Sequence, residues 1–316
     1  MKRRTLLRAS ALLVLFAAGV GLALVWEPDR SVESLAEKWA PPPSQFIALD
    51  GMQVHLRDEG PRDDAEPILL LHGTSASLHT WDGWASDLAT DRRVIRVDLP
   101  GFGLTGPDPA SRYDVASYAR FVVAVMDQLQ VERVVLAGNS LGGQIAWKTA
   151  HDHPARVSTL ILVDAAGYAY EPESIPIGFR LARNPLFAPL LTRILPRSTV
   201  AASLRDVYGD PSRVDDALVD RYFELTLRAG NRRAIAERFE QMPLDAREAE
   251  IKDVRQPTLI LWGAKDRLIP LKFGERFAQE MPEARLVVFD ALGHVPHEED
   301  PAATVRVVRG FLEEGR

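Results

Sequence analysis

Residues 131–147, VERVVLAGNSLGGQIAW, place one serine between glycines at the point where a strand-like sequence becomes helix-like. The apolar run before the serine is typical of a buried strand. Residues Gly138 to Gly142 match the pattern G-x-S-x-G. That pattern marks a turn so tight that the flanking positions have no room for side chains, and it lifts the serine above the sheet. The stretch therefore predicts a strand–turn–helix unit that presents Ser140 as a nucleophile.

Apolar, strand-like runs alternate with helical patterns on both sides of this unit. The runs lie at residues 68–73, 93–101, 133–138, 158–164, 257–263 and 284–290, and the helical patterns at 114–129, 141–152, 271–280 and 299–313. Two earlier stretches, FIALD and MQVHLRD, form a predicted hairpin with Asp50 and Gly51 at its turn. Continuous apolar runs are typical of parallel strands buried on both faces. The sequence thus predicts an α/β fold with a doubly wound, mostly parallel, eight-stranded sheet.

One long interval, between Asp164 and Pro257, interrupts this alternation with residues of helical character. It is too long for one crossover helix and too structured for a disordered loop. Within it, one helix is expected to begin near Ser212 and to stop at Gly230. We predict that residues 168–250 form an inserted helical cap on a core of residues 46–167 and 251–316. The cap would lie over the sheet's C-terminal edge, where open α/β sheets bind ligands.

The N-terminus has the pattern of a membrane-directed segment. Four basic residues (Lys2, Arg3, Arg4 and Arg8) precede an uncharged apolar run that ends at Trp26. The run is long for a signal peptide, and its small residues form only a weak cleavage site. Residues 1–27 are therefore predicted to be a signal anchor, a transmembrane helix, followed by a linker over residues 28–45. Because the positive flank stays in the cytoplasm, the catalytic domain is expected on the extracytoplasmic side, anchored or, after cleavage, secreted.

Composition excludes several classes of function. The net charge is −6, and four of the first eight residues are basic, so the net charge of the remaining chain is more negative still. Such a body lacks the positive footprint of a nucleic-acid-binding protein. The chain contains no cysteine, which excludes disulfides, thiolate nucleophiles and cysteine-ligated metals.

A nucleophilic serine needs a histidine base and an acid that orients the histidine. In a fold of this kind both follow the serine, on loops after later strands. Asp266 and His294 lie in the loops after the last two predicted strands, and they are the expected acid and base. Asp164, which ends an earlier strand, is the rival for the acid. His297, at the start of the final helix, is expected behind the site or at the surface.

Two backbone amides are needed to stabilise an oxyanion in such a site. One belongs to the residue after the nucleophile, Leu141, and the other to the loop after the third strand. That loop contains His72, Gly73 and Thr74, and we assign the second donor to the amide of Thr74. Gly73 joins the elbow glycines, Gly138 and Gly142, as a residue required by a tight turn.

Five motifs follow one another along the chain: HGTSAS, DLPGFG, GNSLGG, WGAKDRLIP and GHVPHEEDP. In this order they resemble the α/β-hydrolase superfamily, in its branch with a serine nucleophile and a helical cap. The resemblance covers residues 46–314. It implies a serine hydrolase with Ser140 as nucleophile, Asp266 as acid and His294 as base, and it implies no metal and no organic cofactor.

The nucleophile limits the chemistry that the resemblance implies. Epoxide hydrolases and haloalkane dehalogenases of this superfamily use an aspartate at the position of Ser140. The main expectation is therefore an esterase- or lipase-type enzyme that cleaves carboxylic esters of apolar acyl groups through an acyl-enzyme. The alternative is a hydrolase of the carbon–carbon bond in ring-fission diketone acids. A hypothesis from another functional class is a non-catalytic, anchored binding protein on a hydrolase scaffold.

The predicted cap contains a basic and apolar stretch without acids, from residue 174 to residue 204. Its arginines are Arg180, Arg183, Arg193 and Arg197. Its apolar residues either line the acyl pocket or form a surface that rests on anionic lipid. The expected partners are thus a small-molecule or lipid ester and a membrane, reached through the N-terminal helix and, in the second case, the cap.

Overall fold

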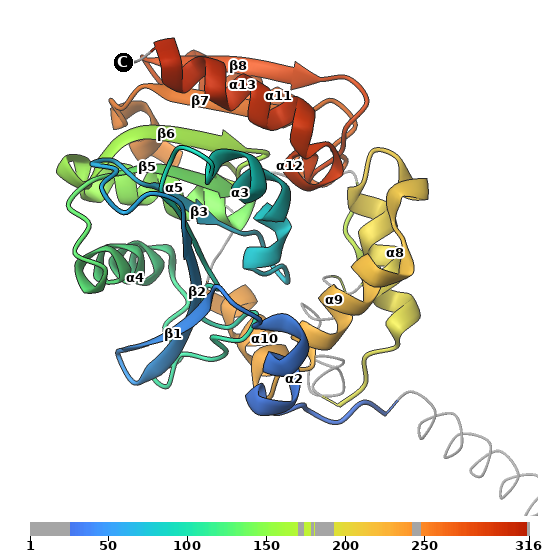
Figure 1. Ribbon diagram of the computed structural model, residues 1–316. Helices are drawn as coiled ribbons and strands as arrows, with labels where there is room; N and C mark the ends of the chain where they lie inside the picture. Colours follow the sequence, from blue (N-terminus) through green and yellow to red (C-terminus); the bar gives the residue numbers. More distant parts are fainter. Residues whose placement is uncertain (1–25, 170–173, 178–179, 181–192, 242–247, 315–316) are drawn as a thin grey trace, which may run out of the picture.

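The computed structural model describes residues 26–169, 174–177, 180, 193–241 and 248–314 (Figure 1). Residues 1–25, which carry most of the predicted membrane anchor, lie outside this part, as does Arg183 of the cap. Among the described residues, no helix combines the length and the apolar character needed to cross a bilayer.

A single eight-stranded sheet organises the described chain, in the order β1-β2-β4-β3-β5-β6-β7-β8. The strands are β1 (Ser44–Leu49), β2 (Met52–Glu59), β3 (Ile68–Leu71), β4 (Val94–Val97), β5 (Val134–Asn139), β6 (Val157–Val163), β7 (Thr258–Gly263) and β8 (Ala284–Phe289). The β1–β2 and β2–β4 pairs are antiparallel, and the other pairs are parallel. Asp50 and Gly51, both with positive φ, turn the first hairpin. The predicted doubly wound, mostly parallel sheet is confirmed.

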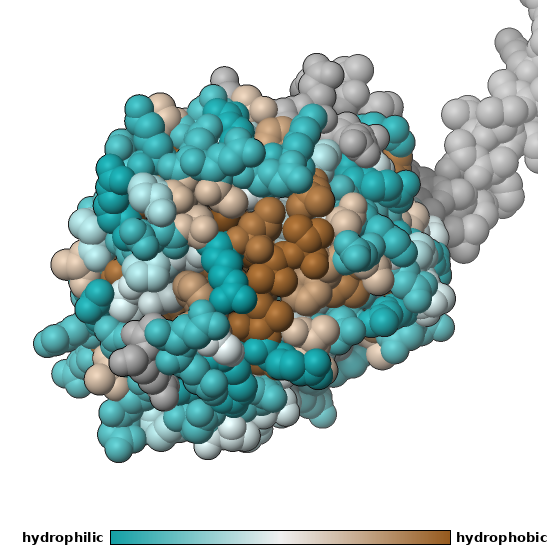
Figure 2. Space-filling view, turned by 90° about the horizontal axis from the view of Figure 1, so that it is seen from above, coloured by the Kyte–Doolittle hydropathy of each residue, from teal (hydrophilic) through white to brown (hydrophobic). Residues whose placement is uncertain are grey.

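Helices cover both faces of the sheet because alternate residues of its inner strands point to opposite sides. In β3, Leu69 and Leu71 belong to one apolar cluster, whereas Ile68 and Leu70 belong to another. The first cluster packs under α4 (Val115–Gln128), α5 (Leu141–Asp152) and α11 (Lys272–Glu280), and the second under α3 (Asp82–Leu88) and α13 (Pro301–Glu314). The face on which β8 and α13 lie has hydrophobic side chains gathered in one area of a largely hydrophilic surface (Figure 2).

Among the described residues between β6 and β7 lie three α-helices: α8 (Arg197–Val207), α9 (Asp216–Thr226) and α10 (Asn231–Gln241). Figure 1 shows them beside the ends of the strands rather than on a face of the sheet. The start of α9 differs from the expectation at Ser212, because Pro211–Arg213 form a separate 3-10 turn. The helix begins only after Asp215, whose side chain accepts a hydrogen bond from the amide of Leu218.

Residues before the sheet pack against these cap helices. Within the stretch predicted to be a linker, residues 32–39 form α2 (Val32–Trp39), capped by the Ser31 side chain. Leu35 of this helix is buried with Leu104 of the core and Leu225 of α9. This packing gives a short polar segment enough buried apolar surface to stay helical.

Candidate active site

The strand–turn–helix unit around Ser140 has the geometry that its glycines predict. Ser140 lies between β5 and α5 with φ 54° and ψ −114°, a region that side-chain-bearing residues rarely adopt. A Cβ atom on Gly138 would lie 2.1 Å from the carbonyl oxygen of Gly142. A Cβ atom on Gly142 would lie 2.2 Å from the carbonyl oxygen of Leu71. Only glycine fits at either position, so the turn can present the serine.

His294 and Asp266 are joined in the structure as a base and its orienting acid would be. Nδ1 of His294 lies 2.6 Å from Oδ2 of Asp266. The other oxygen of Asp266 accepts hydrogen bonds from the amides of Leu268 and Ile269, at 2.8 and 2.9 Å. Both side chains of the pair are buried, so the carboxylate is fixed by three hydrogen bonds and directs Nε2 of the imidazole away from itself.

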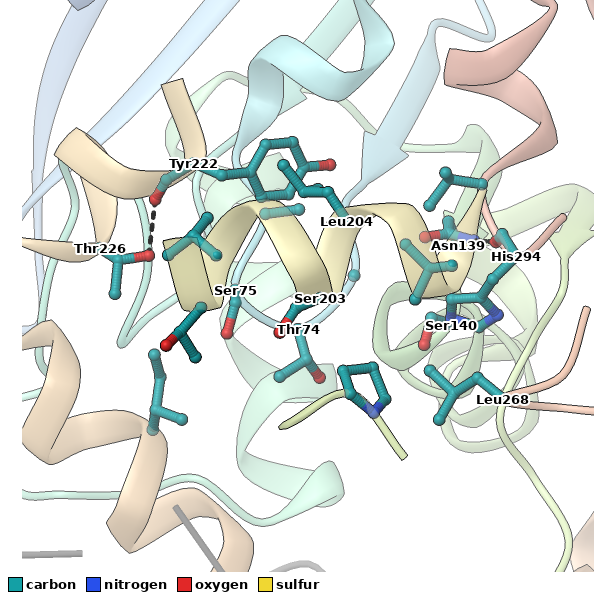
Figure 3. A pocket seen from close by; sticks show the side chains of 18 of the residues that line it. Thr74, Ser75, Asn139, Ser140, Ser203, Leu204, Tyr222, Thr226, Leu268 and His294 are labelled. Carbon is teal, nitrogen blue, oxygen red and sulfur yellow. Dashed lines mark hydrogen bonds between the residues drawn. The ribbon is translucent and has the colours of Figure 1, made fainter. Parts of the chain in front are cut away.

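Ser140 and His294 line one cavity between the core and the cap. Figure 3 shows them at the same end of it, with Leu204 of α8 across the cavity and Tyr222 and Thr226 of α9 further along. Most of the lining is apolar and comes from the cap. Its apolar side chains include Leu195, Val200, Leu204, Val207, Ile235, Leu268 and Val295.

The proposed oxyanion donors flank the nucleophile. Leu141 is the first residue of α5, so its amide has no partner within the helix. Thr74 lines the cavity, and the loop before it approaches the elbow closely. A Cβ atom on Gly73 would lie 3.2 Å from Cβ of Ser140, which shows how near this loop comes.

His72 supports that loop and does not line the cavity. Its Nε2 accepts a hydrogen bond from the amide of Leu99, and its Nδ1 donates to the carbonyl oxygen of Gly73. Burial lowers the pKa of His72, which keeps the ring in the neutral form that this pattern requires.

Asp164, the rival acid, lies close to the pair but does not contact the histidine by a hydrogen bond. Its Oδ1 accepts a hydrogen bond from the amide of Gly263, at 3.0 Å. Burial, together with the charge of Asp266, raises the pKa of Asp164 well above its ordinary range. This environment favours the neutral form of Asp164, and the structure joins Asp266, not Asp164, to His294.

Two groups of side chains in the described part bring potential metal ligands together. One is His151, Asp152 and Glu250 near the surface, and the other is Asp164, Asp266 and His294. In the second group the imidazole is already bonded to Asp266, and the Asp266 carboxylate accepts two amide hydrogen bonds. In that group the imidazole and the carboxylate of Asp266 are therefore already engaged with each other.

His297 is fully buried, so its predicted placement at the surface is excluded, whereas a place behind the site is what the structure shows. Its ring centroid lies 4.0 Å from that of Trp81, and its Nε2 lies 3.1 Å from the hydroxyl of Thr80. Burial lowers the pKa of His297 well below its ordinary value. A neutral histidine in this position supports the loop behind His294.

Three residues that hold His294 were not identified from the sequence. Nδ2 of Asn139 donates to the carbonyl oxygen of His294, at 2.9 Å. The amide of His294 donates to the carbonyl oxygen of Val207 in α8, at 2.7 Å. Glu299 accepts hydrogen bonds from the amides of Gly293 and Gly209, at 2.9 and 3.0 Å. Of the three, Asn139 could have been noticed in the sequence, because it lies inside the elbow motif around Ser140.

Comparison with known proteins agrees with this geometry. A family model described as the alpha/beta hydrolase fold matches residues 66–301. The 2-hydroxy-6-oxo-2,4-heptadienoate hydrolase of Pseudomonas putida is 30% identical over 278 residues, which are 85% of this chain and 95% of that protein. The 2-hydroxymuconate semialdehyde hydrolase of a Pseudomonas species is also 30% identical, over 85% of this chain and 93% of that protein.

Two solved structures are similar along most of their length. A meta-cleavage product hydrolase from Pseudomonas fluorescens has a TM-score of 0.75 and 25% identity, covering 86% of this chain and 98% of its own. A structure described as a membrane phospholipase A, a bacterial virulence factor, has a TM-score of 0.74 and 27% identity. The second match covers 99% of both chains.

Proposed function

Because the chain belongs to the alpha/beta hydrolase fold family, we propose that it is a serine hydrolase whose triad is Ser140, His294 and Asp266. One observation carries this proposal. His294 lines the same cavity as Ser140 and has its Nδ1 2.6 Å from Asp266, so its other nitrogen is free to serve the nucleophile.

The mechanism follows from the roles that these positions permit. Nε2 of His294 takes the proton of Ser140 while the serine oxygen attacks a substrate carbonyl. The amides of Leu141 and Thr74 stabilise the oxyanion, each by roughly 3 kcal/mol. Asp266 holds the imidazole in one tautomer and stabilises the imidazolium that forms. The tetrahedral adduct then collapses, the ester bond breaks, and His294 gives its proton to the leaving alcohol. Water attacks the acyl-enzyme while His294 takes its proton, and the acid is released as Ser140 regains its hydrogen.

We propose that the scissile bond is a carboxylic ester of an apolar acyl group. The lining of the cavity supports this, because aliphatic side chains from α8, from α10 and from the core form a large part of it. The similarity to the membrane phospholipase A supports it too, since that match extends over both chains almost completely. An acyl chain would bury apolar surface against the cap while its carbonyl lies at Ser140.

Hydrolysis of a carbon–carbon bond is the second candidate. The names of the two Pseudomonas relatives support it better than they support ester cleavage. The same triad could attack the ketone carbonyl of a ring-fission diketone acid. Such a substrate carries a carboxylate, and the cavity contains one permanent cation among its described residues, Arg232.

We further propose that the protein is anchored in a membrane by residues 1–27, with its catalytic domain on the extracytoplasmic side. The basic flank and the apolar run of the N-terminus support this. The match to the membrane phospholipase A covers 99% of this chain, whereas the match to the meta-cleavage product hydrolase covers 86% of it. Alkaline carbonate extraction of membranes, with C-terminal alkaline phosphatase and fluorescent-protein fusions, tests both the anchoring and the side.

The activity is tested with full-length protein in detergent, since α2 and its flanking residues pack on the cap. Turnover is measured with p-nitrophenyl esters from acetate to palmitate and with 2-hydroxy-6-oxohepta-2,4-dienoate. Ser140→Ala and fluorophosphonate labelling run beside them. Ester turnover that is lost in the variant, with the label on Ser140, supports ester hydrolysis. Turnover of the dienoate alone would indicate carbon–carbon cleavage. If folded protein shows no turnover and takes no label, the binding-protein hypothesis is favoured.

A further inference from the structure

Arg232 lies in the first turn of α10 and lines the cavity that holds Ser140. Its side chain is only 4% exposed. The surrounding cap side chains that line the cavity are apolar or carry neutral hydroxyls, as Ile235, Val200 and Thr226 do. A guanidinium group is therefore held in a mostly apolar space, where an uncompensated charge is unfavourable.

Only one nitrogen of this guanidinium group has hydrogen-bond partners within the described residues. Nη2 donates to the carbonyl oxygen of Glu27 and to Oδ1 of Asp29, at 2.8 and 2.5 Å. Nε and Nη1 are buried and have no partner there. Native structures seldom leave buried donors unpaired, and such donors call for a physical explanation. The bonds of Nη2 fix the side chain in place, with two donors still available.

The charge around Arg232 is incompletely balanced. Asp29, its partner, is 45% exposed and also accepts a hydrogen bond from the amide of Gly230. Glu33 and Asp29 both act on the half-buried guanidinium of Arg228, whose pKa is lowered by burial. Arg232 thus shares the charge of Asp29 with a second arginine, and the described lining of the cavity contains no Asp or Glu. The balance favours a bound anion.

We propose that Arg232 binds an anionic group of the substrate, a carboxylate or a phosphate, at a position separate from the carbonyl that Ser140 attacks. Nε and Nη1 donate to the anion, while Asp29 and Glu27 hold the guanidinium through Nη2. The rest of the molecule is apolar and packs along the cap side chains. This inference rests on the proposed hydrolase function and adds the charge of the substrate to it.

The test compares matched neutral and anionic esters on full-length protein in detergent. The carboxylate pair is p-nitrophenyl butyrate and the p-nitrophenyl monoester of glutaric acid. The phosphate pair is 1-hexanoylglycerol and 1-hexanoylglycerol 3-phosphate. The variants are Arg232→Gln, Arg232→Lys and, as a matched control, Arg233→Gln. Arg233 is the next residue of the same helix, and its side chain is 76% exposed.

In at least one pair, wild-type protein should prefer the anionic ester. Arg232→Gln should lower kcat/KM for that ester by about tenfold, chiefly through KM, as the loss of a hydrogen bond to a charged group predicts. It should change kcat/KM for the neutral partner little. Arg232→Lys should retain part of the preference, and Arg233→Gln should retain all of it. The pair that responds identifies the anion as a carboxylate or a phosphate.

An equal loss on both members of each pair, or no preference in wild-type protein that turns over the neutral esters, would overturn the proposal. Absence of Ser140-dependent turnover with every substrate would instead count against the proposed hydrolase function. Thermal unfolding of each variant separates a folding defect from a binding defect. If Arg232→Gln does not fold, the Lys variant decides by the same ratio of anionic to neutral kcat/KM.

Discussion

Nδ1 of His294 lies 2.6 Å from Oδ2 of Asp266, although a second buried carboxyl group, that of Asp164, lies beside them. The two acids differ in their environments. Asp266 receives hydrogen bonds from two amides and the imidazole, whereas Asp164 receives one, from Gly263. The first environment stabilises a carboxylate and the second a neutral acid.

Substitution of the two acids should therefore have unequal effects. Asp266→Asn should lower kcat by about 10³- to 10⁴-fold, because an amide cannot hold His294 in the required tautomer. Asp164→Asn should leave most of the activity, since the amide resembles the neutral acid in shape and charge. Steady-state kinetics with the best ester measures both. Losses of equal size would mean that Asp164 is ionised and shares the role of the acid.

The elbow predicts a contrast between two glycine-to-alanine substitutions. Gly142→Ala should lower the free energy of unfolding by about 3 kcal/mol or more, because its Cβ would lie 2.2 Å from the carbonyl oxygen of Leu71. Gly310→Ala is the control, since nothing lies within 4 Å of its Cβ position in α13. It should raise stability by about 0.8 kcal/mol. Urea unfolding measures both, and a fully stable Gly142→Ala protein would contradict the observed packing.

Buried histidines should make the protein less stable in mild acid. Burial lowers the pKa of His79 to about 4, from 6.5 in the unfolded chain. Above the unfolded value both states are neutral, and between the two values only the unfolded state binds the proton. Stability should fall by about 1.4 kcal/mol per pH unit in that window from this residue alone. His72 and His297, whose pKa values burial also lowers, act in the same direction.

The contribution of His79 is measured by urea unfolding of wild type and His79→Gln from pH 7 to pH 4.5. The variant should start less stable, because His79 bonds to the carbonyl oxygen of Trp39. Its stability should then decline less steeply with falling pH. If the free energy of unfolding falls equally with pH in the two proteins, protonation of His79 does not destabilise the folded state.

If the cap rests on anionic lipid, two of its exposed arginines should matter for substrate in vesicles. Arg180 and Arg193 are both exposed. A basic residue near an anionic membrane surface contributes about 1 kcal/mol to membrane binding. Replacing both arginines with Glu should therefore reduce turnover of a vesicle-borne ester by at least about tenfold and leave turnover of p-nitrophenyl butyrate unchanged. The control is Arg133→Glu with Arg255→Glu, which makes the same charge change on exposed side chains before β5 and β7. An equal loss on both substrates would leave the cap without a lipid-binding role.

The sequence predicted those features that depend on local rules. The elbow around Ser140 could be predicted because its steric requirement falls within five consecutive residues. The positions of Asp266 and His294 could be predicted because each follows a strand that the apolar pattern marks. The doubly wound, mostly parallel sheet followed from the alternation of apolar runs and helices.

Features that depend on contacts between distant residues could not be predicted. The apolar contacts of Leu35 with the core and α9 stabilise α2, and a polar stretch before three prolines gave no sign of them. The hydrogen bond between Arg232 and Asp29 joins residues 203 positions apart in the chain. The prediction of a single helix from Ser212 to Gly230 was wrong for a local reason. Pro211 begins a short 3-10 helix, and α9 begins separately after its N-cap residue Asp215.

The amide of His294 is held by the carbonyl oxygen of Val207, and Glu299 bonds to amides on both sides of the same junction. The loop that carries the base and the end of α8 are thus parts of one hydrogen-bonded unit. Enzymes of changed specificity made by exchanging caps should therefore keep residues 207–210 with the parent core. A chimera that replaces them would alter the geometry of catalysis together with the choice of substrate. Among natural relatives, the cap sequence is expected to vary more outside residues 207–210 than within them.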